Sequence, residues 1–356
     1  MAAVLLWPAP DRSVESGDSL RSAVTKLNIA SQGQLAQTAE ARIPAQLELW
    51  SPANLASARE ERALQRARID FTAGVSRAGF RELDLTLNSD EESIWCFMRP
   101  AGPPSFTPTL LQELISMRRM LQRMFANLPP GEAAPIKYFV GGSRIPGVYN
   151  LGGDLGFFIK SIRARDIDAL RNYAHDCVDV AYQMTVGFHL PLITIALVQG
   201  DALGGGFEGA LSFNVLVAEK KAKFGLPEIL FNLFPGMGAF SFLSRKLDMT
   251  RAHKMILSGR VFGAPELHEM GLIDVLAEDG RGEEAVRDYI AQNRRHHAVH
   301  RRVREVGLRV NPLSLEELRD VTDIWAEHAM RLQESDLRNM ERLANAQLRR
   351  VKYARP

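Results

Sequence analysis

The feature that most constrains the fold is the stretch at residues 193–198, Ile-Thr-Ile-Ala-Leu-Val, which contains no charged residue. A run this apolar is typical of a strand that is buried on both faces, and such strands belong to parallel sheets covered by helices. A second apolar run at residues 215–218 follows a segment that has room only for a very short helix. Strand and helix therefore alternate along the chain, which predicts an α/β fold built in layers.

Patterns on either side of these strands extend the alternation. Charged and apolar side chains alternate at residues 82–87, and an aromatic-rich segment follows a turn, so we expect two more strands there. Ser314 and Glu317 form a capping box that opens a helical C-terminal region. The other predicted elements are a strand at 93–98, a helix at 107–128 that stops at Pro-Pro-Gly, a strand at 136–140, a long helix at 163–189 and helices over 314–350.

The first 65 residues differ in composition from the rest. They contain Trp7 and Trp50 but no Phe or Tyr, so they offer little apolar area to offset the entropy of ordering. We predict a poorly ordered extension over residues 1–65, with helical composition at 57–69. A folded core at residues 66–310 and a helical region at 311–356 complete the predicted organisation.

Composition and charge exclude several classes of protein. With 46% hydrophobic and 24% charged residues, the chain is neither disordered as a whole nor fibrous. Its longest apolar stretch is far shorter than the ~20 residues that span a bilayer, and no basic segment precedes the apolar residues at 2–7. A net charge of +2 gives no argument for nucleic acid. We expect a cytoplasmic protein that binds no nucleic acid and inserts in no membrane.

Two local features remain. Cys96 and Cys177 are the only cysteines, and neither lies in a metal-binding or disulfide-rich pattern, so we expect buried free thiols and no metal site. Residues 294–304 contain five arginines and three histidines. This segment is either a solvated basic face or a patch for an acidic partner.

Two glycine-rich turns allow a ligand to approach the backbone, at residues 151–154 (Leu-Gly-Gly-Asp) and 203–208 (Leu-Gly-Gly-Gly-Phe-Glu). The second matches G-x-G-x-x-G, but the strand before it ends too early and the helix after it is too short for dinucleotide binding. No P-loop or serine-hydrolase motif occurs. Glycines at a helix start expose backbone N–H groups, and two such groups aimed at one carbonyl form an oxyanion hole. The alternative is that both segments are only tight turns.

Two carboxylates favour the catalytic interpretation. Glu208 ends the second glycine turn, and Glu228 lies between Pro227 and Ile229 in an otherwise apolar segment. Burial disfavours the charged form of a carboxyl group and raises its pKa, which suits a general acid or base. Each glutamate alone is more often structural. Together, next to two candidate oxyanion turns, they predict an active site.

These residues resemble the crotonase (enoyl-CoA hydratase/isomerase) superfamily over residues 80–350. The resemblance lies in 151–154, in 195–208 (Ile-Ala-Leu-Val-Gln-Gly-Asp-Ala-Leu-Gly-Gly-Gly-Phe-Glu), in 224–228 (Phe-Gly-Leu-Pro-Glu), in 234–238 (Phe-Pro-Gly-Met-Gly) and in 270–274 (Met-Gly-Leu-Ile-Asp). Within the superfamily, residues 225–238 and the region of Trp325 look most like the diffusible-signal-factor synthases of bacterial quorum sensing.

The resemblance implies a ββα spiral, a C-terminal helical region over the active site, and assembly as a homotrimer or a dimer of trimers. It implies that Gly153 and Gly205 form the oxyanion hole and that Glu208 and Glu228 are the catalytic acids. The residues implied to contact the acyl thioester are Leu203, Gly204, Met237 and Trp325. No cofactor and no metal are implied.

The implied reaction is the dehydration of a 3-hydroxyacyl thioester followed by hydrolysis, which releases a cis-2-unsaturated fatty acid. Glu228 would take the C2 proton, and Glu208 would protonate the departing hydroxyl group. The substrate is carried on the phosphopantetheine of acyl carrier protein or on CoA. Hydratases often have a lysine for the CoA phosphates two residues after Asp154, and this chain has Gly156 there, which favours the carrier protein. A sensor kinase is the regulatory partner that the resemblance implies.

Two alternatives remain open. One is an enoyl-CoA hydratase/isomerase of fatty-acid metabolism, which leaves the thioester intact. The other is a non-catalytic crotonase-fold protein that binds a partner or RNA, although a scaffold has no use for two acids in an apolar pocket.

Overall fold

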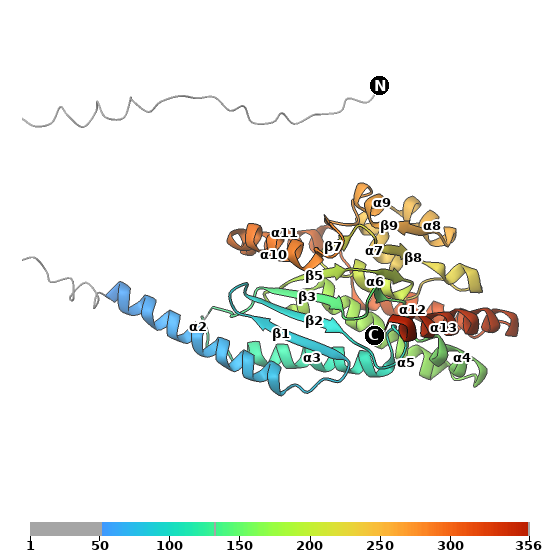
Figure 1. Cartoon of the computed structure of the whole chain (residues 1–356), viewed down its shortest axis with the longest axis horizontal. Helices are drawn as coiled ribbons and strands as arrows, with labels where there is room; N and C mark the ends of the chain where they lie inside the picture. Colours follow the sequence, from blue (N-terminus) through green and yellow to red (C-terminus); the bar gives the residue numbers. More distant parts are fainter. Residues whose placement is uncertain (1–51, 132, 355–356) are drawn as a thin grey trace, which may run out of the picture. The chain divides into compact units, whose positions relative to one another are not determined.

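The structure is a computed structural model that describes residues 52–131 and 133–354 (Figure 1). Within these residues the strands form one sheet of six and one of four, so the predicted α/β class is confirmed. The larger sheet has the order β1 (Leu83–Asn88), β2 (Ser93–Met98), β3 (Tyr138–Ser143), β5 (Ile193–Val198), β7 (Val215–Glu219) and β10 (Val275–Ala277). The smaller sheet has the order β4 (Val148–Asn150), β6 (Asp201–Leu203), β8 (Lys223–Gly225) and β9 (Val261–Gly263).

The chain alternates between the two sheets. In each of the pairs β3–β4, β5–β6 and β7–β8, the first strand joins the larger sheet and the second joins the smaller one. Helices α4 (Leu155–Arg163) and α5 (Ile167–Thr185) follow the first pair, and the short helix α6 (Gly205–Leu211) follows the second. This repetition of two strands and a helical segment is the predicted ββα spiral.

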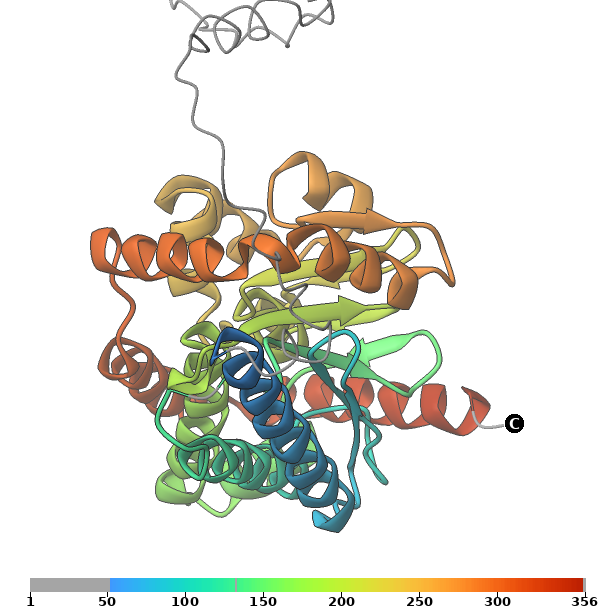
Figure 2. The same cartoon turned by 90° about the vertical axis from the view of Figure 1, so that its left-hand side faces the viewer.

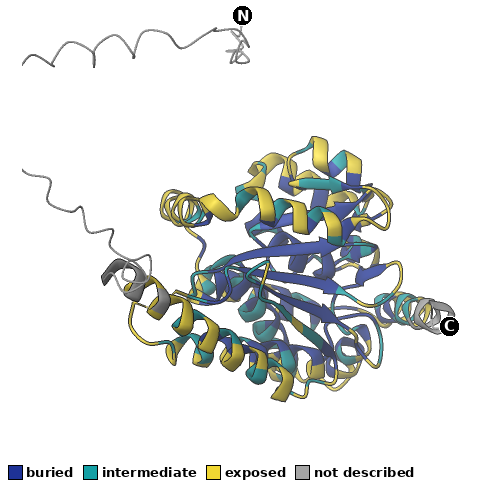
Figure 3. Cartoon of the chain, turned by 60° about the vertical axis from the view of Figure 1, so that its left-hand side comes forward, coloured by how far each residue is buried: buried dark blue, intermediate teal, exposed yellow. Residues whose placement is uncertain are grey.

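The inner strands of the larger sheet, β2, β3, β5 and β7, are buried on both faces, which explains the unbroken apolar run in β5. Ile195 and Leu197 pack on one side, with residues of α10 (Gly282–Asn293). Ala196 and Val198 point to the other side and join the larger core, to which α3 (Pro108–Ala126) and α5 contribute. Figure 2 shows the helices on the two sides of the strands, and Figure 3 shows that the strands are the most buried part of the fold.

The C-terminal region is helical, as predicted. It contains α12 (Leu315–Ala329) and α13 (Glu334–Ala354). The Ser314 hydroxyl group accepts a hydrogen bond of 3.0 Å from the Glu317 N–H, which confirms the N-terminal cap of α12. The Glu317 carboxylate binds Arg245 instead of the Ser314 backbone. The remaining helices are α2 (Pro52–Arg77), α7 (Ala239–Lys246), α8 (Met249–Ser258), α9 (Ala264–Glu269), α11 (His297–Val310) and the 3-10 turns η1 (Gly187–His189), η2 (Pro227–Phe231) and η3 (Arg294–His296).

One predicted helix has different ends in the structure. The helix expected at residues 163–189 is α5, which runs from Ile167 to Thr185, and Arg165 just before it has a φ of 55°. Asp166 then starts α5, because its carboxylate accepts a hydrogen bond of 2.9 Å from the Ala169 N–H. An aspartate at the N-cap favours a helix that begins directly after it. Asp166 therefore sets a later start for α5 than the helical spacing of the apolar residues predicts.

The N-terminal prediction is only partly accessible. Residues 1–51 of the predicted extension lie outside the described residues. Residues 52–65 belong to α2, which contains the helical segment expected at 57–69. No helix among the described residues is long and apolar enough to cross a membrane.

Candidate active site

The site forms where three parallel strands of the smaller sheet end. Strands β4, β6 and β8 are parallel neighbours, so their carboxyl ends lie at one edge of the sheet. The segments that leave these ends are the first glycine turn, the second glycine turn and the Glu228 segment. Three motifs that are up to 77 residues apart in the sequence, from Leu151 to Glu228, therefore meet in space.

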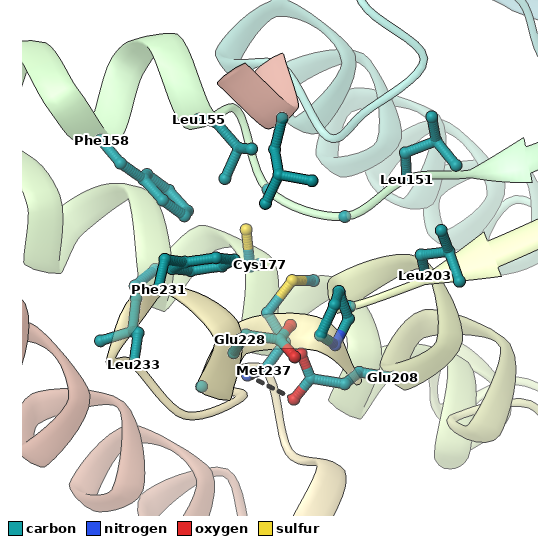
Figure 4. Close-up of a pocket in the computed structure, with 18 of the residues that line it drawn as sticks. Leu151, Leu155, Phe158, Cys177, Leu203, Glu208, Glu228, Phe231, Leu233 and Met237 are labelled. Carbon is teal, nitrogen blue, oxygen red and sulfur yellow. Dashed lines mark hydrogen bonds between the residues drawn. The ribbon is translucent and has the colours of Figure 1, made fainter. Parts of the chain in front are cut away.

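These segments enclose a cavity of about 350 Å³ (Figure 4). All the site residues expected from the sequence line this cavity, namely Gly153, Leu203, Gly204, Gly205, Glu208, Glu228, Met237 and Trp325. The lining is otherwise almost entirely apolar, with side chains from α4, α5, η2, α12 and α13. Among the lining residues, Glu208 and Glu228 are the only ones with a carboxyl group, and none is Lys or Arg.

The first glycine turn is held by its neighbours and leaves one donor free. Gly152 has a φ of 98°, its N–H donates to Asn150 Oδ1 at 2.8 Å, and its carbonyl oxygen accepts from Phe106. The Asp154 N–H donates to the Tyr173 hydroxyl oxygen at 3.0 Å. The N–H between them, on Gly153, has no hydrogen-bond partner among the described residues.

The second glycine turn lies against the first. Gly204 has a φ of 53°, and Gly205 is the first residue of α6, where a backbone N–H has no partner within the helix. A β-carbon built on Gly152 would lie 3.0 Å from the Gly205 nitrogen, and one built on Gly205 would lie 3.4 Å from the Gly153 nitrogen. The N–H groups of Gly153 and Gly205 therefore line the same wall of the cavity, as an oxyanion hole requires.

Glu208 is buried and oriented. It lies in the first turn of α6 with 1% of its surface exposed. Its Oε1 accepts backbone hydrogen bonds from Met237 at 2.7 Å and from Ala239 at 2.9 Å. Burial raises the pKa of Glu208 to about 7, although these two N–H groups oppose the shift.

Glu228 is buried with an unsatisfied oxygen. Its Oε1 lies 2.5 Å from where a β-carbon on Gly204 would be, so only glycine fits opposite it. Its Oε2 is buried without a hydrogen-bond partner among the described residues. Burial raises the pKa of Glu228 well above its usual value, and the nearby charge of Glu208 raises it further.

The two carboxyl groups differ in how well they carry charge. Two backbone N–H groups stabilise the anion of Glu208, and no donor does so at Glu228 Oε2. The pair therefore loses its first proton more readily from Glu208, and the proton that remains is held by Glu228. Such a pair can act as a base at one carboxyl group and as an acid at the other.

Two of the four predicted acyl-contact residues, Met237 and Trp325, pack against the glycine segments, and Met237 is half-buried there. The Met237 sulfur lies over Gly205, and the Trp325 ring lies over Gly236. The Trp325 ring also packs edge-to-face on the Phe158 ring, with 5.1 Å between the ring centroids. Trp325 itself is 4% exposed. The helical spacing of Val321 and Ile324 relative to Trp325 predicts one apolar stripe on this helix, and this prediction is wrong, because Ile324 is 61% exposed. The buried face of α12 instead carries Leu318, Thr322, Trp325, Ala326 and Ala329.

Sequence reasoning missed several residues of the cavity. Tyr173 and Cys177 from α5 line it, one helical turn apart, and so does Gln347 from α13, which donates to the Leu151 carbonyl oxygen at 3.1 Å. Helical spacing put Tyr173 and Cys177 on one face of a helix, but nothing in the sequence indicated that this face meets the glycine turns. Both cysteines are buried, as expected.

The surroundings bear on substrate recognition. Gly156, which replaces the lysine of the hydratases, is exposed, and the exposed Lys160 does not line the cavity. Within the described part of the chain, no three His, Cys, Asp or Glu side chains are grouped as metal ligands.

Known proteins share this sequence pattern and fold. A family model described as Enoyl-CoA hydratase/isomerase matches residues 147–309. A probable mitochondrial enoyl-CoA hydratase 2 of Arabidopsis thaliana is 30% identical over 168 residues, which make up 47% of this chain and 53% of that protein. The chain thus spans about half the length of this curated relative, and less of the probable enoyl-CoA hydratase echA8 of Mycobacterium bovis, of which it covers 31%.

Solved structures agree on the fold. An enoyl-CoA hydratase/isomerase from Xanthobacter autotrophicus Py2 has a TM-score of 0.61 at 18% identity, covering 78% of this chain and 98% of that one. DspI of Pseudomonas aeruginosa has a TM-score of 0.53 at 19% identity, covering 75% of this chain and 95% of that one. The spiral is the fold of these solved structures, and the sequence relatives and the family match support the resemblance to the enoyl-CoA hydratase/isomerase family over residues 147–309.

Proposed function

We propose that this chain dehydrates 3-hydroxyacyl thioesters carried by acyl carrier protein and then hydrolyses the thioester, releasing a cis-2-unsaturated fatty acid as a quorum-sensing signal. The observation that carries the proposal is the pair of buried carboxyl groups, Glu208 and Glu228, beside the N–H groups of Gly153 and Gly205 in one apolar cavity. Removal of a proton next to a thioester carbonyl needs a base and a stabilised enolate oxygen, and both are available here.

Dehydration uses the difference between the two carboxyl groups. Glu228 is the stronger base, so in its ionised form it takes the C2 proton while Gly153 and Gly205 stabilise the negative charge on the thioester oxygen. Glu208 is the stronger acid, so in its protonated form it donates to the 3-hydroxyl group as the C3–O bond breaks. Water leaves, and the proton of the pair has moved from Glu208 to Glu228.

That state is the one that hydrolysis requires. Ionised Glu208 takes a proton from water as the water oxygen bonds to C1, and the oxyanion is stabilised by Gly153 and Gly205. When the C–S bond breaks, Glu228 returns its proton to the sulfur. The products are the free acid and the carrier thiol, and the pair is back in its starting state. One proton thus serves both steps without a serine or cysteine nucleophile.

The proposal names acyl carrier protein as the partner. Neither the cavity nor Gly156 offers a basic side chain for the phosphates of CoA, and a carrier protein needs none inside the cavity. The sensor kinase and the trimeric assembly stay predictions from the resemblance.

A second candidate is an enoyl-CoA hydratase that adds water and leaves the thioester intact. One observation favours it. The resting state of the pair, with Glu208 ionised and Glu228 protonated, is ready for hydration without a prior proton shift. The curated relatives that match the chain are also named as hydratases.

The deciding experiment follows the fate of the thioester. Purified protein is incubated with C8 to C14 3-hydroxyacyl carrier protein and with the same acyl groups on CoA, and mass spectrometry measures the enoyl thioester and the free acid. We expect free unsaturated acid from the carrier-protein substrates, and a loss of at least ~100-fold in Glu208→Gln and Glu228→Gln. Enoyl thioester without free acid would establish the hydratase, and no conversion at all would remove both proposals.

A further inference from the structure

A second cavity lies beneath the reaction cavity, enclosed by β3, α3, α5 and α6. Its volume is about 30 Å³. Since a single water molecule occupies about 10–15 Å³ on this scale, the space admits roughly two methylene-sized groups. Most of its walls are apolar side chains or bare backbone, among them Leu114, Gly141, Ala181 and Phe213.

Glycines make this space. A β-carbon built on Gly141 would lie 2.6 Å from the Phe213 ring, and one on Gly209 would lie 3.0 Å from the Phe106 ring. Any side chain at Gly141 would therefore displace a ring that encloses the cavity. The hydroxyl group of Ser212, which also lines the cavity, donates to the Gly209 carbonyl oxygen at 2.6 Å and so is satisfied without water. An apolar space of this kind stays dry, so filling it with hydrocarbon displaces no bound water.

Two sulfur side chains separate the two cavities. Cys177 and Met237 line both of them, and Figure 4 shows both residues in the wall of the first. The Met237 backbone is fixed, because its N–H donates to Glu208, but its unbranched side chain has three rotatable bonds. Burial raises the pKa of the Cys177 thiol, so this side chain is neutral and small. The two side chains that line both cavities are therefore a flexible thioether and a neutral thiol, and neither carries a charge.

We propose that the end of the acyl chain passes Met237 and Cys177 into the second cavity, and that side chains lining only this cavity, Leu114 and Ala181 among them, set the longest chain that binds. The inference rests on the proposed function, because it takes an acyl thioester as the ligand. An acyl chain is the occupant because the space continues the cavity that holds the reacting carbons and its lining is mostly apolar. Each methylene that leaves water improves affinity about fourfold, which corresponds to ~0.8 kcal/mol.

The test uses ligands that cannot react, so that binding is separated from catalysis. Saturated acyl-pantetheine amides from C8 to C16 lack both the thioester and the 3-hydroxyl group, and calorimetry measures their dissociation constants. In the wild type we expect about fourfold tighter binding per methylene up to a limiting length, followed by a plateau.

Variants then move the limit in opposite directions. Leu114→Ala enlarges the second cavity and should raise the limit by two to three carbons (about the size of the deleted side chain). Ala181→Leu fills the cavity and should lower the limit. Leu170→Ala is the matched control, because Leu170 is equally buried in the same core but lines neither cavity. Val180→Ala replaces Leu114→Ala should the latter fail to fold, since Val180 also lines the second cavity.

The outcomes separate the two levels of the argument. A limit that rises in Leu114→Ala, falls in Ala181→Leu and stays in Leu170→Ala supports the inference. Chain-length dependence with the same limit in all four proteins overturns the inference and leaves the proposed function standing. Absence of any chain-length dependence in the wild type overturns both.

Discussion

The sign of a stability change separates a catalytic glutamate from a structural one, and Glu208 offers the clearest case. Burial raises its pKa from 4.5 to about 7. A carboxyl group with a raised pKa stabilises the fold fully below its unfolded pKa, and this stability is lost as the pH rises through the folded pKa. The pKa of Glu208 thus rises by about 2.5, and a change of one in pKa corresponds to about 1.36 kcal/mol. The ionised Glu208 therefore lowers the free energy of unfolding by about 3 kcal/mol at alkaline pH.

Glu208→Gln removes that cost while keeping the acceptor. The amide oxygen can still accept from Met237 and Ala239, which donate to Glu208 Oε1. We therefore compare the free energy of unfolding of the variant with that of the wild type at each pH. This difference should change by about 3 kcal/mol in favour of the variant between pH 4.5 and pH 8.5. Urea unfolding followed by circular dichroism at both pH values measures this gain, and the same variant should lose at least ~100-fold in activity.

Glu219 is the matched control. It is also fully buried, but hydrogen bonds from Gln199 at 3.0 Å and from the Gly282 N–H at 3.2 Å, with Lys221 nearby, outweigh the effect of burial and lower its pKa. A lowered pKa means stability that is present above the ordinary value and lost as the pH falls through the folded pKa, so Glu219→Gln should be less stable across this whole range. Destabilisation of Glu208→Gln by a similar, constant amount would refute the reasoning and make Glu208 structural.

Three shorter predictions concern the parts around the carboxyl pair. Gly205→Pro deletes one oxyanion donor and should cut dehydration and hydrolysis together by ~10²–10³, with folding checked by circular dichroism; loss of only one activity would show that the steps use different donors. Tyr173→Phe removes the hydroxyl oxygen that accepts a hydrogen bond from the Asp154 N–H, and it should lower kcat about 10- to 100-fold with little change in KM. An effect on thermal stability alone would assign Tyr173 a purely structural role. Trp325→Ala should destabilise the fold by about 3–5 kcal/mol and change the acyl chain-length profile, and an unchanged profile would return Trp325 to the core.

The local signals of the site were readable in the sequence because each is a short-range constraint. Gly152 and Gly204 have positive φ values, which the glycine-rich turns predict, and Glu208 and Glu228 lie in apolar segments whose burial follows from their neighbours. The apolar run of β5 predicted a strand buried on both faces, because successive side chains of a strand point to opposite faces and all of them lack charge here.

What the sequence did not show depends on long-range packing. Tyr173 reaches across to Phe106, 67 residues away, to hold the first glycine turn, and no spacing rule connects the two. The exposure of Ile324 depends on how α12 is rotated on α5, which three apolar residues in a row leave undetermined. The second cavity exists because Gly141 has no side chain next to the Phe213 ring. The sequence does not show that these two residues are neighbours, so it does not predict the cavity.

The pH dependence of turnover follows from the one-proton pair. Both proposed steps begin with a single proton shared by Glu208 and Glu228, so the active fraction falls when a second proton binds. That second proton binds with the pKa of about 7 to which burial raises Glu208. We expect kcat/KM to rise about tenfold per pH unit below pH 7 and to level off above it, since an ordinary glutamate would place this limb near 4.5.

The measurement is a kcat/KM profile from pH 5 to 9 with a 3-hydroxyacyl carrier protein, on protein shown by circular dichroism to stay folded. Residual turnover in Glu208→Gln should lose the limb centred at about pH 7, because the group that binds the second proton is gone, and any remaining pH dependence should follow the ionisation of Glu228. Glu219→Gln should keep it, since that glutamate lines neither cavity. A wild-type profile that is flat from pH 5 to 7 would mean that the pair does not start the reaction with one proton. The closed proton cycle between dehydration and hydrolysis would then be wrong.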